Sequence, residues 1–468
     1  MKHCLRIAAL LAAFISTPLY ATVPPVESFT LANGLEVIVI SNHRVPAVSH
    51  MVWYRIGAGD DPRGKSGLAH FHEHTMFLGT ARHKAGEYTD VIARNGGQEN
   101  AFTGYDATSY YINIAKDKLP LAMELEADRM RALTPTDDAM VKEKQVIIEE
   151  RRMRIENNPE ALLSEQMNAT LFRNHPYHWP VIGWMHEMEG LTKEDVLAFH
   201  RTWYHPNNAI LIVSGDVTAA EVKKLAQTYY GDLPEVALPQ RHWNAEPPQN
   251  SERRLVMHHP NVKQPAWYRN YAASSVAYGK KDETLPLFVL AEALGEGKTS
   301  RLYQTLVVDQ KLATGVEVEY NGFTLGPSQL EISIVPEHGV DLAVLETALD
   351  KELERVAREG FSETELARAR NLLKSETIYA RDGLTSMARI MGWIRMSGLD
   401  KDYFTRWPQL IEAVTPQQVA AAAKDTLQRN QSVTALLLPE ETSEEKPKSQ
   451  PVPQAVPESN ATLKGRRS

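Results

Sequence analysis

The sequence is poor in cysteine, in net positive charge and in long apolar runs. It has 1 Cys among 468 residues, so a scaffold held by disulfides is excluded. Its formal net charge is −8, whereas domains that bind nucleic acid through phosphate contacts are normally basic, so no nucleic-acid partner is expected. No apolar run is long enough to cross a bilayer as a helix, so no membrane span is expected.

The remaining composition is that of a globular protein, with 43% hydrophobic and 24% charged residues. The length is sufficient for two or more domains, each with its own core.

The first 21 residues predict export. Lys2 and Arg6 precede an apolar run that begins at Ile7, and small residues end the segment at Ala21. This order is typical of a secretory signal peptide cleaved after Ala21. Cys4 would leave with it, and a cysteine-free exported chain suits a bacterial periplasm.

Helical and strand patterns alternate after the signal segment. Asn33-Gly34 between apolar runs predicts a hairpin, and residues 47–56 and 108–114 predict strands. Residues 66–78 predict a helix with Ser66 as N-cap, and residues 135–172 predict a long helical stretch interrupted near 157–159. A layered α+β or α/β fold is therefore expected.

An internal repeat indicates two tandem copies of one domain. A helix start, an Asn and an apolar run recur with an offset of 223 residues, as Thr192, Val196, Asn207 and Ile210 and then Thr415, Val419, Asn430 and Val433. Two unrelated helix–strand units that share a common cap are the alternative explanation. We expect a first domain over 22–231, a Pro-rich linker over 232–253, a second domain over 254–439 and a disordered tail over 440–468.

The segment AHFHEH inside the first predicted helix carries the chemistry. His70 and His74 are four residues apart, so on a helix they lie about 40° apart on one face, with Glu73 on the same side. Two imidazoles can then bind one Zn²⁺ while the carboxylate takes a proton from water, which is the H-x-x-E-H arrangement. A His-rich helix with solvent-facing imidazoles is the alternative, and His72 points to another face.

Catalytic zinc usually has three protein ligands, and Glu150 is the candidate for the third. In VKEKQVIIEERRMR, helical spacing places Glu150 on one predicted apolar face with Glu143, while Glu149 lies off it. The other members of that predicted face are Val146, Ile147 and Met153. A glutamate in an apolar stripe is costly unless it is paired or bound to a metal. A solvated charge run is the alternative for this segment.

These segments resemble the pitrilysin family of zinc peptidases, which includes insulin-degrading enzyme and the mitochondrial processing peptidases. The resemblance lies in GLAHFHEHTMFLGT, in EKQVIIEE, in NGGQENAFTGYDATSYY and in SRLYQTLVVDQKLA. It implies a clam-shell of two similar α+β domains around a chamber, each domain a mainly antiparallel sheet packed with helices. It also implies endopeptidase activity on peptides, with one Zn²⁺ per chain.

The resemblance assigns roles to seven residues. It makes His70, His74 and Glu150 the zinc ligands, Glu73 the general base and Glu143 a residue that supports the site. It places Asn100 and Ala101 on a strand edge that pairs with the substrate backbone, which is a physically reasonable way to hold any extended peptide.

The second half departs from the family pattern. Active clam-shells of the family often carry an Arg and a Tyr there that help to hold substrate and the oxyanion, and Val307 and Thr314 stand in their places. The leading hypothesis is a periplasmic zinc endopeptidase, either a heterodimer with a related subunit that supplies Arg and Tyr or a homodimer. A metal-binding assembly subunit with weak activity and an exported metal-storage protein are the alternatives.

Overall fold

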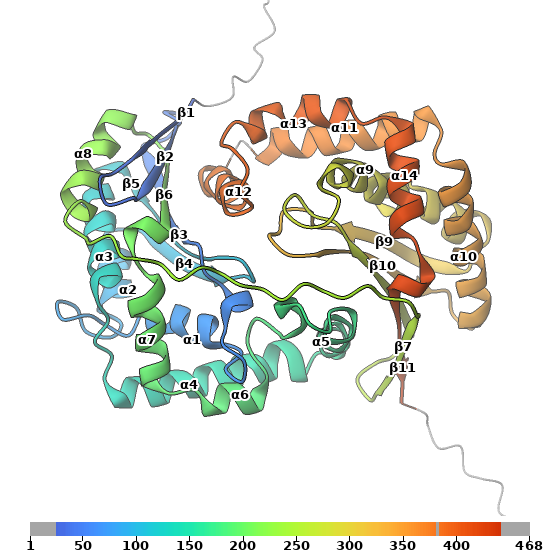
Figure 1. The fold of residues 1–468 in the computed structure, drawn as a ribbon, viewed down its shortest axis with the longest axis horizontal. Coiled ribbons are helices and arrows are strands. Elements are labelled where there is room, and N and C mark those ends of the chain that lie inside the picture. Colours follow the sequence, from blue (N-terminus) through green and yellow to red (C-terminus); the bar gives the residue numbers. More distant parts are fainter. Residues whose placement is uncertain (1–24, 381–382, 441–468) are drawn as a thin grey trace, which may run out of the picture.

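The computed structural model describes residues 25–380 and 383–440, which form two halves, each built on one β-sheet (Figure 1). The 6-stranded sheet of the first half has the order β1-β2-β6-β3-β5-β4. Its neighbouring strands are antiparallel, except that β2 and β6 are parallel. The strands are β1 Val26–Thr30, β2 Glu36–Ser41, β3 Ala47–Tyr54, β4 Gln98–Thr103, β5 Thr108–Ala115 and β6 Ala209–Gly215.

The second half repeats this topology. Its 5-stranded sheet has the order β7-β11-β8-β10-β9, with β7 and β11 parallel and the other pairs antiparallel. The strands are β7 Arg253–His259, β8 Ala266–Ala273, β9 Ala313–Tyr320, β10 Ser328–Pro336 and β11 Ser432–Pro439. The order matches that of the first sheet without β1, so β4 and β9 are equivalent edge strands.

Helices pack on both sheets. Those of the first half are α1 Leu68–Thr75, α2 Glu87–Arg94, α3 Leu119–Arg131, α4 Asp137–Arg151, α5 Pro159–Leu171, α6 Met185–Gly190, α7 Lys193–Trp203 and α8 Ala219–Tyr230. Those of the second half are α9 Thr284–Gly295, α10 Leu342–Glu359, α11 Glu363–Ala380, α12 Leu384–Met396, α13 Tyr403–Glu412 and α14 Pro416–Thr426.

The predicted repeat is confirmed at its four positions. Thr192 and Thr415 are the N-caps of α7 and α14, and both form capping boxes. A short 3₁₀ turn and then β6 or β11 follow each helix. The expected fold of two similar α+β domains arranged as a clam-shell is confirmed (Figure 1).

Each half covers the other half's sheet with one helix. Helix α12 of the second half packs Met387, Met391 and Ile394 on the first sheet, against residues that include Trp53 and Ile212. Figure 1 shows α12 beside the strands of the first half, away from its own sheet. The second face of the first sheet is therefore buried by a helix from the other half.

Helix α5 makes the reciprocal contact. Its Leu163 and Met167 pack in one cluster with Val433, Ala435 and Leu437 of β11. The two halves thus share two apolar interfaces, in addition to the separate cores that each sheet forms with its own helices.

Several local predictions are confirmed. The Asn33-Gly34 segment joins β1 and β2 as an antiparallel hairpin. The long helical stretch is interrupted as expected, because α4 continues into a π-helical turn, η3 Arg152–Glu156, and Asn158 then caps α5 by accepting hydrogen bonds from two backbone N–H groups.

The segment between α8 and β7 has no regular secondary structure, but it is held to the first half. Arg241 pairs with Asp60 at 2.5 Å, and the carboxylate of Glu246 accepts backbone N–H groups from Arg173, Asn174 and His175. The predicted signal peptide over 1–21 and the predicted tail, apart from Glu440, lie outside the described residues. In the part of the chain that the structure describes, no helix is both long and apolar enough to cross a membrane.

Candidate metal centre and active site

Helix α1 presents the histidine pair, and a carboxylate fixes its N-terminus. Asp61 accepts hydrogen bonds from the backbone N–H groups of Gly67 and Ala69, both at 2.8 Å. Gly67 has φ 88°, and a Cβ there would lie 2.6 Å from the carbonyl oxygen of Ile182. The prediction of Ser66 as N-cap is wrong, because the capping oxygen comes from Asp61 and the N-cap position needs a glycine.

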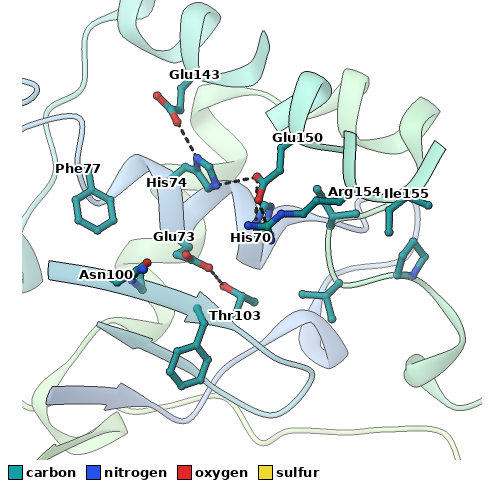
Figure 2. A pocket seen from close by; sticks show the side chains of 15 residues that line it. His70, Glu73, His74, Phe77, Asn100, Thr103, Glu143, Glu150, Arg154 and Ile155 are labelled. Carbon is teal, nitrogen blue, oxygen red and sulfur yellow. Dashed lines mark hydrogen bonds and ion pairs between the residues drawn. The ribbon is translucent and has the colours of Figure 1, made fainter. Parts of the chain in front are cut away.

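His70, His74 and Glu150 converge from α1 and α4. Figure 2 shows the three side chains pointing toward one another, with Oε2 of Glu150 3.7 Å from Nε2 of His70 and 3.3 Å from Nε2 of His74. Their candidate donor atoms all lie within 4.8 Å of one another. Among the described residues, this is the one group of His, Cys, Asp or Glu side chains placed to hold a metal ion.

The donor set fits zinc. Bonds of about 2.0–2.2 Å in a tetrahedral arrangement put neighbouring ligand atoms about 3.3–3.6 Å apart, close to the distances from Glu150 to the two imidazoles. Oε2 of Glu150 is buried and faces both imidazoles at ion-pair distance. Two imidazole nitrogens and a carboxylate oxygen are ligands that zinc accepts in catalytic sites.

Glu143 orients His74. Its Oε1 lies 2.7 Å from Nδ1 of His74, which leaves Nε2 of that ring directed at Glu150. Burial disfavours a charged His74, but the hydrogen bonds to Glu143 and Glu150 and the nearby Glu73 carboxylate outweigh it and raise the His74 pKa to about 9. The three carboxylates around His74 therefore favour positive charge at this position, on the imidazole itself or on an ion bound to it.

Helix α4 distinguishes its two adjacent glutamates. The Glu150 side chain is 14% exposed, whereas that of Glu149 is 65% exposed and pairs with Arg152. The predicted apolar face is only partly present. Ile147 is buried, but Val146 and Met153 are exposed. The part of the predicted face that carries Val146 and Met153 is therefore in contact with solvent.

Glu73 is the other carboxylate beside the histidine pair. It is buried, and Oε2 accepts a hydrogen bond from the hydroxyl of Thr103 at 2.5 Å. Burial raises the pKa of Glu73, and the Thr103 hydrogen bond opposes this shift. Figure 2 shows Glu73 between the metal-ligand candidates and strand β4.

These residues line one cavity of about 600 Å³. Its lining includes His70, Glu73, His74, Glu143 and Glu150, residues 100–103 of β4, and a loop over residues 180–182. Strand β4 is a sheet edge, so Asn100 and Ala101 lie where an added strand can pair. The Ala101 N–H donates to Oδ1 of Asn100 at 2.8 Å.

Sequence reasoning missed Arg154 and Thr103. The Arg154 guanidinium lies 3.0 Å from Oε1 of Glu150, and Arg154 is the one Lys or Arg among the described residues that line the cavity. Its position four residues after Glu150 is a signal that helical spacing offers. No local signal identifies Thr103, because its contact with Glu73 depends on how β4 packs against α1.

Val307 and Thr314 lie apart from this cavity. Val307 is half-buried in the π-helical turn η7 Tyr303–Asp309 and packs against the core of the second half. Thr314 is exposed in β9, and its hydroxyl donates to the carbonyl oxygen of Val335 at 3.3 Å. Neither residue lines the cavity that holds the histidine pair.

Two family descriptions match most of the chain. The one described as Insulinase (Peptidase family M16) matches residues 36–183, and the one described as Peptidase M16 inactive domain matches residues 190–373. A similar protein, zinc protease PqqE of Helicobacter pylori, is 34% identical over 320 residues, which cover 67% of this chain and 71% of that protein.

Solved structures share the fold. A protease from Helicobacter pylori aligns with a TM-score of 0.83 at 29% identity, over 89% of this chain and 100% of that one. The periplasmic protease PqqL from Escherichia coli aligns with a TM-score of 0.76 at 19% identity, over 88% of this chain and 47% of that one, which is a likeness of fold. With these matches, the chain belongs to the M16, or pitrilysin, family of zinc peptidases.

Proposed function

We propose that the chain is a zinc-dependent endopeptidase that hydrolyses extended peptides. One observation carries this proposal: His70, His74 and Glu150 converge next to Glu73, in a cavity that also contains an edge strand. The cavity therefore combines a metal-ligand set, a buried carboxylate and a surface for peptide backbone.

His70, His74 and Glu150 would hold one zinc ion, and Glu143 would keep the His74 ring in place through Nδ1. A bound zinc ion supplies a Lewis acid that polarises the scissile carbonyl and makes water a nucleophile at neutral pH.

Glu73 acts as the general base in this proposal. Its carboxylate takes a proton from the attacking water and then delivers it to the leaving amine. Thr103 holds one carboxylate oxygen, and the water would be bound by the other. Burial raises the pKa of Glu73 above its ordinary value, which brings it closer to neutral pH and makes the proton easier to accept.

Strand β4 binds the substrate backbone in this proposal. A peptide that pairs with Asn100 and Ala101 extends the sheet by one strand and crosses the cavity beside Glu73. A carbonyl oxygen of the peptide would replace Oδ1 of Asn100 as the acceptor of the hydrogen bond from the Ala101 N–H. Recognition through main-chain hydrogen bonds requires an extended segment but no particular sequence.

We place the protein in the periplasm. The support is the predicted signal peptide over 1–21 and the absence of cysteine from the rest of the chain. The similar PqqL of Escherichia coli is described as a periplasmic protease.

A metal-binding subunit with weak activity of its own is the second candidate. Val307 and Thr314 favour it, because neither can hold an oxyanion as Arg and Tyr do, and neither lines the cavity. In that case a related partner would complete the site.

The test is zinc content and cleavage of an unstructured peptide library by the exported chain. We expect one zinc per chain and hydrolysis, and we expect Glu73→Gln to abolish hydrolysis while zinc stays bound. Glu99→Gln is the matched control, since Glu99 also accepts a threonine hydroxyl, from Thr89, but lies outside the cavity lining. Turnover above a few per cent in Glu73→Gln would rule out Glu73 as the base.

A further inference from the structure

A second cavity, of about 320 Å³, is lined mainly by apolar side chains of the second half, including those of α12. Aromatic rings dominate its wall, among them Phe288, Phe323, Trp393, Tyr403 and Trp407. Among the described residues of that lining, Asn321 and Thr377 contribute the only amide and aliphatic hydroxyl groups. The volume lies at the small end of ligand-binding cavities, which span about 300–1,000 Å³, and suits one bulky side chain.

The wall of this aromatic cavity is accessible. Four of its aromatic side chains are only half-buried: Phe288, Phe323, Trp393 and Tyr403. The ring of Phe323 packs against those of Phe288 and Tyr403. Half-open aromatic walls around an empty apolar volume are typical of a binding site, because burial of a ligand there removes the remaining apolar surface from water.

The aromatic cavity adjoins the candidate active site, and two rings in contact lie between them. Phe102 of β4 lines the first cavity, and its ring centroid lies 5.8 Å from that of Trp393, which lines the second. Trp393 also lies against the end of β4, since a Cβ on Gly104 would be 3.2 Å from its ring. A peptide that extends the sheet along β4 therefore passes from Glu73 toward Trp393.

Neighbouring charge restricts the occupant. An adjoining cavity shares Phe288, Asn321 and Leu373 with the aromatic cavity. It is also lined by Glu292, Glu296, Glu317, Glu319 and Glu331. Five glutamates repel fatty acids and other anionic amphiphiles, whereas a neutral or cationic peptide is not repelled.

We propose that the aromatic cavity is a substrate subsite that takes one bulky apolar side chain of a peptide bound along β4. The subsite rests on the proposed peptidase function and adds a preference at a position remote from the scissile bond. Backbone pairing on β4 gives affinity for any extended peptide, and the aromatic cavity selects among such peptides.

The experiment compares peptides that differ only by Phe or Ala, with the substitution scanned along the chain. Affinity is measured by fluorescence anisotropy on Glu73→Gln loaded with zinc, so that binding is observed without hydrolysis. At one position, Phe should bind about tenfold or more tightly than Ala, because a buried Phe side chain leaves water there. A photo-reactive benzoylphenylalanine at that position should cross-link to residues of the aromatic cavity.

Two variants test the assignment. Phe323→Ala opens the wall and Ile390→Trp fills the cavity, and each should abolish the preference for Phe at that position. Phe29→Ala is the matched control, because Phe29 is also half-buried but lies on β1, outside the aromatic cavity. Thermal unfolding of each variant verifies that it is folded.

A Phe preference that survives both variants, or no preference at any position, would overturn the subsite. Either result, obtained while the wild type hydrolyses the same peptides, leaves the proposed peptidase function intact. Conversely, a Phe preference in binding that both variants remove, in a chain that hydrolyses none of the peptides, supports the subsite and argues against the peptidase function.

Discussion

At the scale of single residues, two adjacent glutamates on α4 have opposite surroundings. Glu150 faces both imidazoles of the histidine pair, whereas Glu149 is exposed and pairs with Arg152. We expect Glu150→Gln to lower zinc occupancy markedly and Glu149→Gln to leave it unchanged, as measured by metal analysis after dialysis. The reverse result would show that the ligand is Glu149.

Arg154 is the cationic residue placed to meet negative charge in the cavity. A peptide carbonyl under attack develops negative charge, and loss of one donor to that charge typically costs about 10²–10³ in rate. We expect Arg154→Ala to lower kcat by about that factor with less effect on KM. Arg152→Ala is the control, because Arg152 does not line the cavity. Equal kcat values in the two variants would exclude this role.

His50 predicts a dependence of stability on pH. It is fully buried in β3, and burial, assisted by the charge of Arg129, lowers its pKa to about 3. An unfolded histidine has a pKa of about 6.5, so below that pH the unfolded chain binds a proton that the folded chain does not. The contribution of neutral His50 to the free energy of unfolding is therefore complete above pH 6.5 and is lost progressively as the pH falls toward 3.

Urea unfolding at several pH values measures this contribution. The free energy of unfolding of the wild type minus that of His50→Gln should fall by about 2 kcal/mol between pH 7.5 and 5. Taking this difference cancels the other titrating groups that the two proteins share. A difference that is constant with pH would contradict a neutral His50.

At the scale of helices and strands, periodicity predicted the local elements well. The hairpin at Asn33-Gly34 and the break before Asn158 depend on residues adjacent in sequence, so their patterns were sufficient. The Ser66 cap failed because the carboxylate of Asp61, several residues earlier, takes that role through a tertiary arrangement.

The apolar face of α4 was predicted too widely for a related reason. Helical spacing groups Val146 and Met153 with Ile147, but the extent to which a face is covered depends on what packs against it. The spacing argument nevertheless placed Glu143 and Glu150 on the side of the histidine pair, because their separation is two helical turns.

Gly392 in α12 shows how tightly this helix packs on the first sheet. A Cβ at this position would lie 2.0 Å from the Trp53 ring. Gly→Ala inside a helix usually stabilises by about 1 kcal/mol, but here the overlap should reverse the sign and destabilise the protein by about 1–3 kcal/mol.

The control for this prediction is Gly190→Ala, because Gly190 ends α6 and its Cβ would meet nothing within 4 Å. Denaturant unfolding should separate the two variants. A stabilised Gly392→Ala protein would indicate that α12 is not seated on Trp53 in solution.

At the scale of the whole molecule, the prediction concerns a partner. If a related subunit supplies the missing Arg and Tyr, the purified chain should bind zinc normally but cleave slowly, and the partner should raise turnover by about 10²–10³ or more. Titration of activity with a candidate subunit that lacks the H-x-x-E-H motif measures this. Full activity from the chain alone would refute the heterodimer and point to donors within this chain, among which Arg154 is the candidate.

The reciprocal placement of α5 and α12 has a consequence for the origin of the chain. Each helix covers the sheet of the opposite half, and the two halves share one topology. A lone ancestral half would have exposed an apolar sheet face and carried a helix with no sheet to cover. Two copies that exchange this helix satisfy both needs through a two-fold, isologous contact. The ancestor of the chain would therefore have been a homodimer. Duplication of its gene and fusion of the two copies would have turned an interface between subunits into the interior of one chain.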